Sequence, residues 1–239
     1  MKKLFIHIPK TGGMTLRKNN IIRQYILLSI PKYFKNKAYY EGITKTMEII
    51  GDHPGYEHAR WRDLNPEILN KYTSFAIVRN PWARVVSRFM FAKKVIYEEE
   101  SSDHYGDKNY ADVSSFEAFL EERHKWGNKK YMWHRAIRGW YPALDYVSDL
   151  KNEVQCDIIR LEHFNNELPR YLNTDKLKGD IERRNVTGYK QDYKSFYNKK
   201  TIQIIADWYK RDIDYWGYDF DSSATRNTYY TWKKRIKWK

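Results

Sequence analysis

The sequence predicts an α/β fold in which a mainly parallel sheet is covered by helices on both faces. Three short apolar runs rich in β-forming residues occur at residues 4–8, 73–79 and 157–161. Segments with helical spacing of apolar residues lie between them, and this alternation favours parallel strands joined by crossover helices. Without an internal repeat or a recognisable linker, the chain fits one domain spanning residues 1–239.

A glycine turn separates the first strand from the helix expected after it. The apolar run at residues 4–8 ends at a proline and is followed by Gly12 and Gly13. Over residues 15–28 apolar side chains recur at close to helical spacing, so a helix is expected directly after the glycines. Residues 31–55 have a mixed pattern that favours no particular element.

The second strand, residues 73–79, lies between two capped helices. The expected caps are Asp63 or Asn65 for a short helix before the strand and Asn80 for the helix after it, which ends near Tyr97. Each cap is followed by a proline at a position that suits the first turn of a helix.

A polar, acidic stretch follows at residues 98–112 and is expected to be a surface loop. Ser114 and Glu117 have the spacing of a capping box and predict another helix start. After the third strand, a helical apolar stripe covers residues 197–216. A basic tail that also carries Tyr and Trp occupies about residues 222–239.

Composition and charge narrow the function only in part. The formal net charge of +14 concentrates anions around the protein, whether nucleic acid, acidic polysaccharide, a membrane surface or a phosphorylated cofactor. The single cysteine, Cys156, excludes an intramolecular disulfide and a cysteine-based metal site, and no metal is expected. No signal peptide and no apolar run of about 20 residues is present, so we expect a cytoplasmic protein without a membrane span.

The turn after the first strand has the features of an anion site. Glycines at positions 12 and 13 allow the backbone N–H groups to approach a ligand, and the N-terminus of the next helix favours negative charge. Lys10 adds a positive charge, and Thr11 and Thr15 add hydroxyl groups. The alternative is a tight strand-to-helix turn with an exposed lysine. The nucleotide-binding motif G-x-x-x-x-G-K-[ST] is absent, because Lys10 precedes the glycines.

A second basic site follows the second strand. Arg79 ends that strand, and Ser87 lies eight positions later in the next helix. An arginine fork and a hydroxyl group can together hold a phosphate, although an arginine at a strand end and a helical serine can also be purely structural. Because ligands of parallel sheets bind at the carboxyl ends of the strands, Lys10 and Arg79 are expected to face one pocket.

These two segments carry a family resemblance. Residues 9–15 (PKTGGMT) and 78–87 (VRNPWARVVS) resemble the paired motifs of sulfotransferases that use 3′-phosphoadenosine-5′-phosphosulfate (PAPS). Weaker similarity at residues 157–164, 185–187 and 209–220 extends the resemblance over most of the chain. The branch it resembles most contains heparan 2-O- and chondroitin sulfotransferases and their bacterial relatives. The resemblance implies a P-loop-like three-layer α/β/α fold, and the many residues with AT-rich codons favour a bacterial or phage source.

The resemblance also implies roles for individual residues. The first motif would hold the 5′-phosphosulfate, the second the 3′-phosphate, and a later loop would close over the adenosine. The residues concerned are Lys10, Thr11, Gly12, Gly13, Met14 and Thr15, then Arg79 and Ser87, then Arg184 and Asn185. Two positions depart from the family pattern: Met14 replaces a hydroxyl residue, and Asn80 stands where aspartate is common. Adenosine 3′,5′-bisphosphate (PAP) would be the product.

Sulfuryl transfer needs a base for the acceptor hydroxyl and positive charge at the leaving phosphate. Lys10 is the expected source of that charge. For the base we favour His58, which lies in the segment where heparan 2-O-type enzymes carry their catalytic histidine. His53, in an Asp-His-Pro turn, and Glu57 are the alternatives.

The acceptor is expected to be a carbohydrate, with an acidic chain favoured by the positive charge. Aromatic rings stack on sugars, and Lys or Arg pairs with carboxylates or sulfates. The candidate rings are those of Trp61, Trp126, Trp133 and Trp140. Nucleic-acid binding, suggested by the basic charge and the tail, is the alternative from another class, although no recognition motif supports it. A kinase or another nucleotide-dependent transferase is the third possibility.

Overall fold

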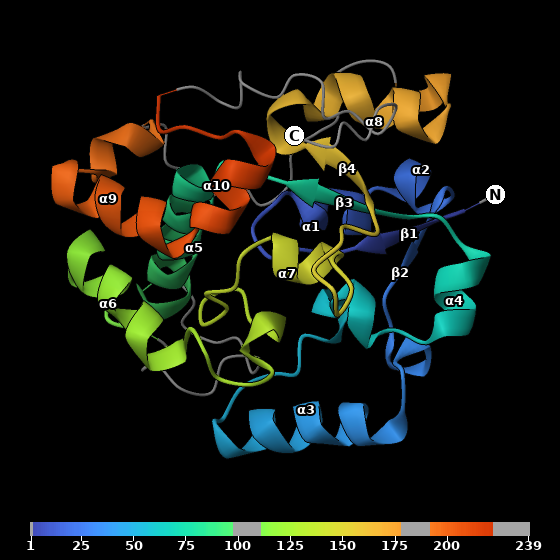
Figure 1. The fold of residues 1–239 in the computed structure, drawn as a ribbon, viewed down its shortest axis with the longest axis horizontal. Coiled ribbons are helices and arrows are strands. Elements are labelled where there is room, and N and C mark those ends of the chain that lie inside the picture. Colours follow the sequence, from blue (N-terminus) through green and yellow to red (C-terminus); the bar gives the residue numbers. More distant parts are fainter. Residues whose placement is uncertain (1, 98–110, 178–191, 222–239) are drawn as a thin grey trace.

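A four-stranded parallel sheet lies at the centre of the computed structural model, which describes residues 2–97, 111–177 and 192–221 (Figure 1). The strand order is β2-β1-β3-β4. The strands are β1 (Lys3–Ile6), β2 (Ile26–Leu28), β3 (Ser74–Val78) and β4 (Asp157–Arg160). The predicted parallel α/β sheet is confirmed, and the three predicted strands occur within one or two residues of their expected bounds.

The strands alternate their side chains between two apolar layers. In β1, Leu4 and Ile6 belong to the larger core cluster, whereas Phe5 belongs to the smaller one. In β4, Ile158 and Ile159 divide in the same way. Because side chains along a strand point alternately to opposite faces, the two clusters lie on the two sides of one sheet. The result is the expected three-layer α/β/α arrangement.

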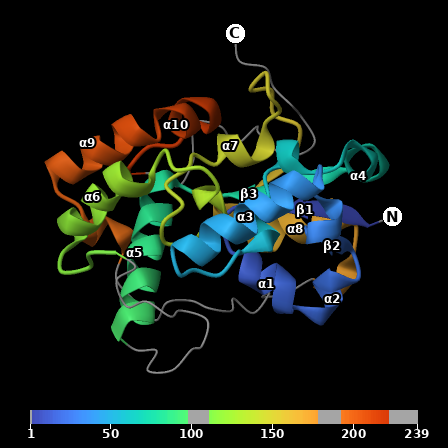
Figure 2. The same cartoon turned by 90° about the horizontal axis from the view of Figure 1, so that it is seen from below.

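Helices from different parts of the chain cover the two faces (Figures 1 and 2). The smaller cluster includes residues of α1 (Gly13–Lys18), α2 (Asn20–Arg23) and α8 (Phe164–Leu172). The larger cluster includes residues of α3 (Lys37–Ile49), α5 (Pro81–Tyr97), α6 (Phe116–Trp126), α7 (Leu144–Val147), α9 (Lys199–Trp208) and α10 (Lys210–Trp216). The short α4 (Pro66–Lys71) precedes β3.

The caps of the two helices around β3 follow the sequence. Asn65, the second of the two candidates, caps α4 by accepting a hydrogen bond from the N–H of Glu67 at 2.8 Å. Asn80 caps α5, and its side-chain oxygen accepts from the N–H groups of Trp82 and Ala83 at 3.0 and 3.3 Å. These bonds anchor the start of α5 directly beside Arg79.

The expected helical spacing over residues 15–28 does not produce one helix. The backbone of Asn19 is extended, and its side chain accepts from the N–H groups of Ile21 and Ile22, so α1 ends and the short α2 begins. Asparagine competes for backbone hydrogen bonds in this way and so interrupts helices. Residues 26–28 then form β2, whose pairing with β1 outweighs their helical spacing.

Other local differences have similar causes. The helix α3 lies in the mixed segment 31–55, with Tyr39, Ile43 and Met47 buried on one face. Ser115, one residue later than expected, caps α6. The stripe over residues 197–216 divides near Tyr209 into α9 and α10.

Several predictions fall outside the described residues. These are residues 98–110 of the surface loop expected at 98–112, the adenosine loop with Arg184 and Asn185, and the basic tail at 222–239. Within the described residues, no helix is long and apolar enough to cross a membrane.

Candidate active site

The turn that joins β1 to α1, residues 8–14, is called the anion loop below. Lys10 and Gly12 have left-handed backbones, with φ of 66° and 85°. No hydrogen bond within the described part of the chain uses the backbone N–H groups of residues 10–14. Successive N–H groups in such a turn form a concave site for an anion, and a run of unbonded donors at a helix start calls for one. The predicted anion site therefore has its backbone donors in place.

The carbonyl groups of the same loop are occupied. The Thr11 hydroxyl donates to the Ile8 carbonyl at 2.9 Å. Arg84 Nε donates to the Pro9 carbonyl at 3.1 Å, and Arg79 Nη1 donates to the Lys10 carbonyl at 3.4 Å. The hydroxyl proton of Thr11 is thus used inside the loop, and the contact of Thr11 with the cofactor stays a prediction.

Packing explains the glycines of the loop. A Cβ atom at Gly13 would lie 1.8 Å from Nε2 of His7. A Cβ at Gly12 would lie 2.8 Å from Cδ1 of Leu161, at a φ that side chains disfavour. The close approach at Gly13 brings the loop against the ring of His7, which is buried as expected.

Lys10 lies in a strongly positive environment. Its Nζ is 4.0 Å from the ring centre of Phe91, a residue of α5. Burial, together with the charges of Arg79, Arg88 and Lys94, lowers the pKa of Lys10 to about 7. Such crowding of cations is relieved when an anion binds.

The second predicted phosphate site, formed by Arg79 and Ser87, begins at the end of β3. Arg79 lies next to β1 through its contact with the anion loop, as expected from the adjacent parallel strands. Ser87 lies two turns into α5 and is 8% exposed. The N–H of Asn80, between them, donates to Oε1 of Glu162 at 2.8 Å. The structure thus brings Arg79 to the anion loop, while the phosphate contact of Ser87 stays a prediction.

His58 has the geometry of a base. It ends a short helical turn, Tyr56–His58, and its Nδ1 lies 2.9 Å from the carbonyl oxygen of His7. Because a carbonyl only accepts, Nδ1 carries the proton and Nε2 keeps its lone pair. Burial lowers the pKa of His58 to about 4, although the charge of Glu57 opposes the shift. The ring is therefore neutral at pH 7.

The two alternative bases, Glu57 and His53, already have polar partners within the protein. Burial raises the pKa of Glu57, but the charges of His58 and Arg17 outweigh it and leave the pKa well below its ordinary value. Its carboxylate is ion-paired with Arg17 of α1 and lies 4.0 Å from Nε2 of His58. The Nδ1 of His53 accepts from the N–H of Gly55 at 2.8 Å. Both contacts favour His58.

The base and the anion loop meet at His7. The rings of His7 and His58 are 4.2 Å apart. Burial lowers the pKa of His7, and the charge of His58 lowers it further. The charges of Arg17 and Lys10 act in the same direction, whereas that of Glu57 raises the pKa. Residues distant in sequence thus gather around the C-terminal end of β1.

One residue of this site escaped the sequence analysis. Arg84 is 1% exposed, and it contacts the anion loop from within the second motif. A charged residue among the apolar residues Trp82, Val85 and Val86 is the signal that could have revealed it.

Most of the predicted sugar-stacking rings are unavailable. Trp126, Trp133 and Trp140 are at most 6% exposed and belong to the larger core cluster, whereas Trp61 is half-buried. A core position leaves no ring face for a sugar, so Trp126, Trp133 and Trp140 pack in the core and do not stack on the acceptor.

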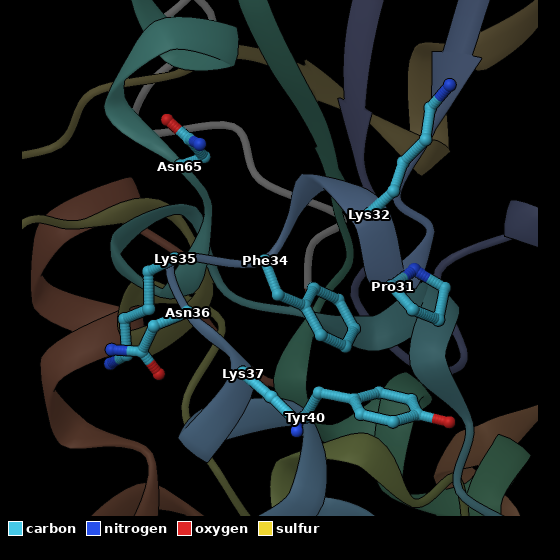
Figure 3. A pocket seen from close by; sticks show the side chains of 8 residues that line it. All are labelled: Pro31, Lys32, Phe34, Lys35, Asn36, Lys37, Tyr40 and Asn65. Carbon is cyan, nitrogen blue, oxygen red and sulfur yellow. The ribbon is translucent and has the colours of Figure 1, made fainter.

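A surface hollow of about 410 Å³ lies beside the turn that carries His58 (Figure 3). Phe34 lies at its centre, between Lys32 and Lys35. The ring centre of Phe34 is 6.0 Å from that of Tyr56. The lining residues are Pro31, Lys32, Phe34, Lys35, Asn36, Lys37, Tyr40 and Asn65.

No group of three or more His, Cys, Asp or Glu side chains that could hold a metal ion occurs in the described ranges.

Comparison with known proteins agrees with the geometry of the two strand ends. The model of the sulfotransferase family matches residues 2–219. No curated protein matches the chain significantly, and no solved structure does. The matched range covers both predicted motifs, all four strands and His58. The chain therefore belongs to the sulfotransferase family, and it is a PAPS-dependent enzyme that transfers a sulfuryl group.

Proposed function

We propose that the enzyme transfers the sulfuryl group of PAPS to a hydroxyl of a carbohydrate, with His58 as the base and Lys10 at the leaving phosphate. The observation that carries this proposal is the anion loop, where five successive N–H groups have no described partner. Arg79 lies within hydrogen-bond reach of the same loop. This donor set fits a nucleotide with a phosphate group at each end.

The residues divide the chemical work. PAPS supplies a sulfuryl group that is activated by its bond to a phosphate oxygen. His58 takes the proton of the acceptor hydroxyl on Nε2, while the acceptor oxygen forms its bond to sulfur in line with the bond that breaks. The electron pair of the broken bond stays on the 5′-phosphate, where Lys10 and the N–H groups of the anion loop stabilise the charge. Glu57, 4.0 Å from Nε2, stabilises the imidazolium.

The hollow around Phe34 supports a carbohydrate acceptor, and an acidic one in particular. Its three lysines attract carboxylate or sulfate groups, with Lys35 also ion-paired to Asp63 and Lys37 to Glu41. The exposed ring of Tyr40 offers an aromatic face to a sugar. Tyr56 joins the hollow to the turn of His58, because its ring centre is 5.4 Å from that of Tyr40. The hollow therefore adjoins the short turn that carries both Tyr56 and His58.

Donor binding is tested with PAP. The bisphosphate should raise the melting temperature of the purified protein, and Lys10→Ala should remove most of this rise. A melting temperature that does not change with millimolar PAP would contradict the proposal. ATP serves as the competitor, because a kinase would favour it over PAP.

The acceptor is tested by a screen with isotopically labelled PAPS and mass spectrometric detection. Neutral oligosaccharides, acidic oligosaccharides and nucleic acids form the three arms. We expect sulfated product from carbohydrates, with acidic chains preferred. Salt-dependent binding of DNA or RNA together with no response to PAP would instead favour the nucleic-acid alternative.

A further inference from the structure

Side chains hold three successive carbonyl groups of the anion loop. The donors are Thr11 to Ile8, Arg84 to Pro9, and Arg79 to Lys10. In a planar trans peptide the C=O and the next N–H point in opposite directions. A side chain that holds the Pro9 carbonyl therefore also sets the direction of the Lys10 N–H, and the bond to the Lys10 carbonyl sets the Thr11 N–H.

Arg84 is the most firmly placed of these donors. It is 1% exposed on α5, and its Nη1 donates to the carbonyl of Tyr141 at 3.0 Å. Its Nη2 has no hydrogen-bond partner among the described residues. The guanidinium thus spans two backbone carbonyls, one in the loop before α7 and one in the anion loop.

We propose that Arg84 is a positioning residue, which holds the Pro9 carbonyl so that the N–H of Lys10 and those after it face the bound anion. We call the two hydrogen bonds of Arg84 to the carbonyls of Pro9 and Tyr141 the clamp. Burying an arginine in a helix face is costly unless its donors are used, and the clamp uses them. The identity of the anion as the 5′-phosphosulfate rests on the proposed function. The clamp itself rests on the contacts of Arg84.

Arg88 offers a matched control one turn further along α5. It is 0% exposed, and it donates to the carbonyl of Gly139 and to the hydroxyl of Tyr209 at 3.2 Å. Neither of these hydrogen bonds reaches the anion loop. Replacing either arginine by lysine keeps the charge but removes the planar fork that can hold two carbonyls.

The experiment compares Arg84→Lys and Arg88→Lys with the wild type, all as the full chain. Isothermal titration calorimetry measures the affinity for PAP and for adenosine 3′-monophosphate, which lacks the 5′-phosphate. Melting temperatures without ligand report the structural cost of each change. Arg84→Gln is the second variant, for use if the lysine variant does not fold. Its side-chain amide keeps an N–H donor but has no charge.

The clamp predicts a selective loss. Arg84→Lys should weaken PAP about tenfold or more, the effect of a lost charge-assisted bond, and should change the affinity for the 3′-monophosphate less than about twofold. Arg88→Lys should leave the ratio of the two affinities unchanged. An equal loss for both ligands in Arg84→Lys, an unchanged PAP affinity, or the same selective loss in Arg88→Lys would overturn the proposal.

Failure of the proposed function gives a different result, in which the wild type binds neither nucleotide. The clamp is then judged with inorganic sulfate as the probe. Sulfate should raise the melting temperature of the wild type and of Arg88→Lys more than that of Arg84→Lys. An equal rise in all three proteins, or none in the wild type, would overturn it.

Discussion

The charge of Lys10 makes PAP binding depend on pH in a range where most lysines stay protonated. Burial and the nearby arginines hold the pKa of Lys10 at about 7 in the empty site. A bound bisphosphate favours the ammonium form and raises the pKa again, so binding takes up a proton from solution. Affinity should therefore fall as the pH rises above 7.

The size of this effect follows from the pKa. With a pKa of about 7, about a quarter of the empty molecules carry a charged Lys10 at pH 7.5, and about 3% do at pH 8.5. The affinity for PAP should thus fall roughly eightfold between these two pH values, or about 1.2 kcal/mol. The phosphate groups of PAP are already fully ionised in this range and add little.

Isothermal titration calorimetry in buffers of different ionisation enthalpy measures both the affinity and the number of protons taken up. Uptake should be close to one proton at pH 8.5. Lys10→Arg is the control, because arginine stays charged and its affinity should not change over this range. A wild-type affinity that is constant from pH 7.5 to 8.5, without proton uptake, would refute the reasoning about Lys10.

Three further predictions concern the base and the loop. His58→Ala should lower kcat by about two orders of magnitude or more while PAP still binds. His53→Ala should keep most of the turnover, and steady-state kinetics with calorimetry on both variants shows which histidine is the base. Glu57→Gln should lower the pKa of His58, because the carboxylate raises it, so the acidic fall in kcat at saturating PAPS should move to lower pH; a move to higher pH contradicts the assigned contact. Gly13→Ala should abolish PAP binding, because its Cβ would lie 1.8 Å from the His7 ring, and the double change with His7→Ala should restore part of it in a thermal-shift assay.

The unliganded protein provides a check on the same lysine. The unfolded chain keeps a proton on Lys10 up to its ordinary pKa of 10.5, whereas the folded protein releases it near 7. Because the unfolded state binds more protons between these values, the contribution of Lys10 to stability becomes more favourable as the pH rises through that range. Lys10→Met should therefore raise the melting temperature more at pH 6.5 than at pH 9.

Local patterns in the sequence were sufficient where a single segment decides the outcome. Asn80 and its following proline cap α5 because capping uses backbone donors within three residues. The apolar run before Arg79 becomes β3, and the glycines after Lys10 become the anion loop. Where a segment depends on a distant partner, as β2 does on β1, helical spacing gave the wrong element.

The sequence by itself determined the parallel α/β architecture, the anion loop and the membership suggested by its two motifs, because strand periodicity, turn chemistry and motif spacing are properties of short segments. Only the tertiary structure decided that Arg84 donates to the Pro9 carbonyl, that Nδ1 of His58 faces the His7 carbonyl, and that Arg17 forms an ion pair with Glu57. These contacts join residues 40 to 75 positions apart in the chain. Their formation depends on how the sheet and α5 pack together, which no local pattern encodes.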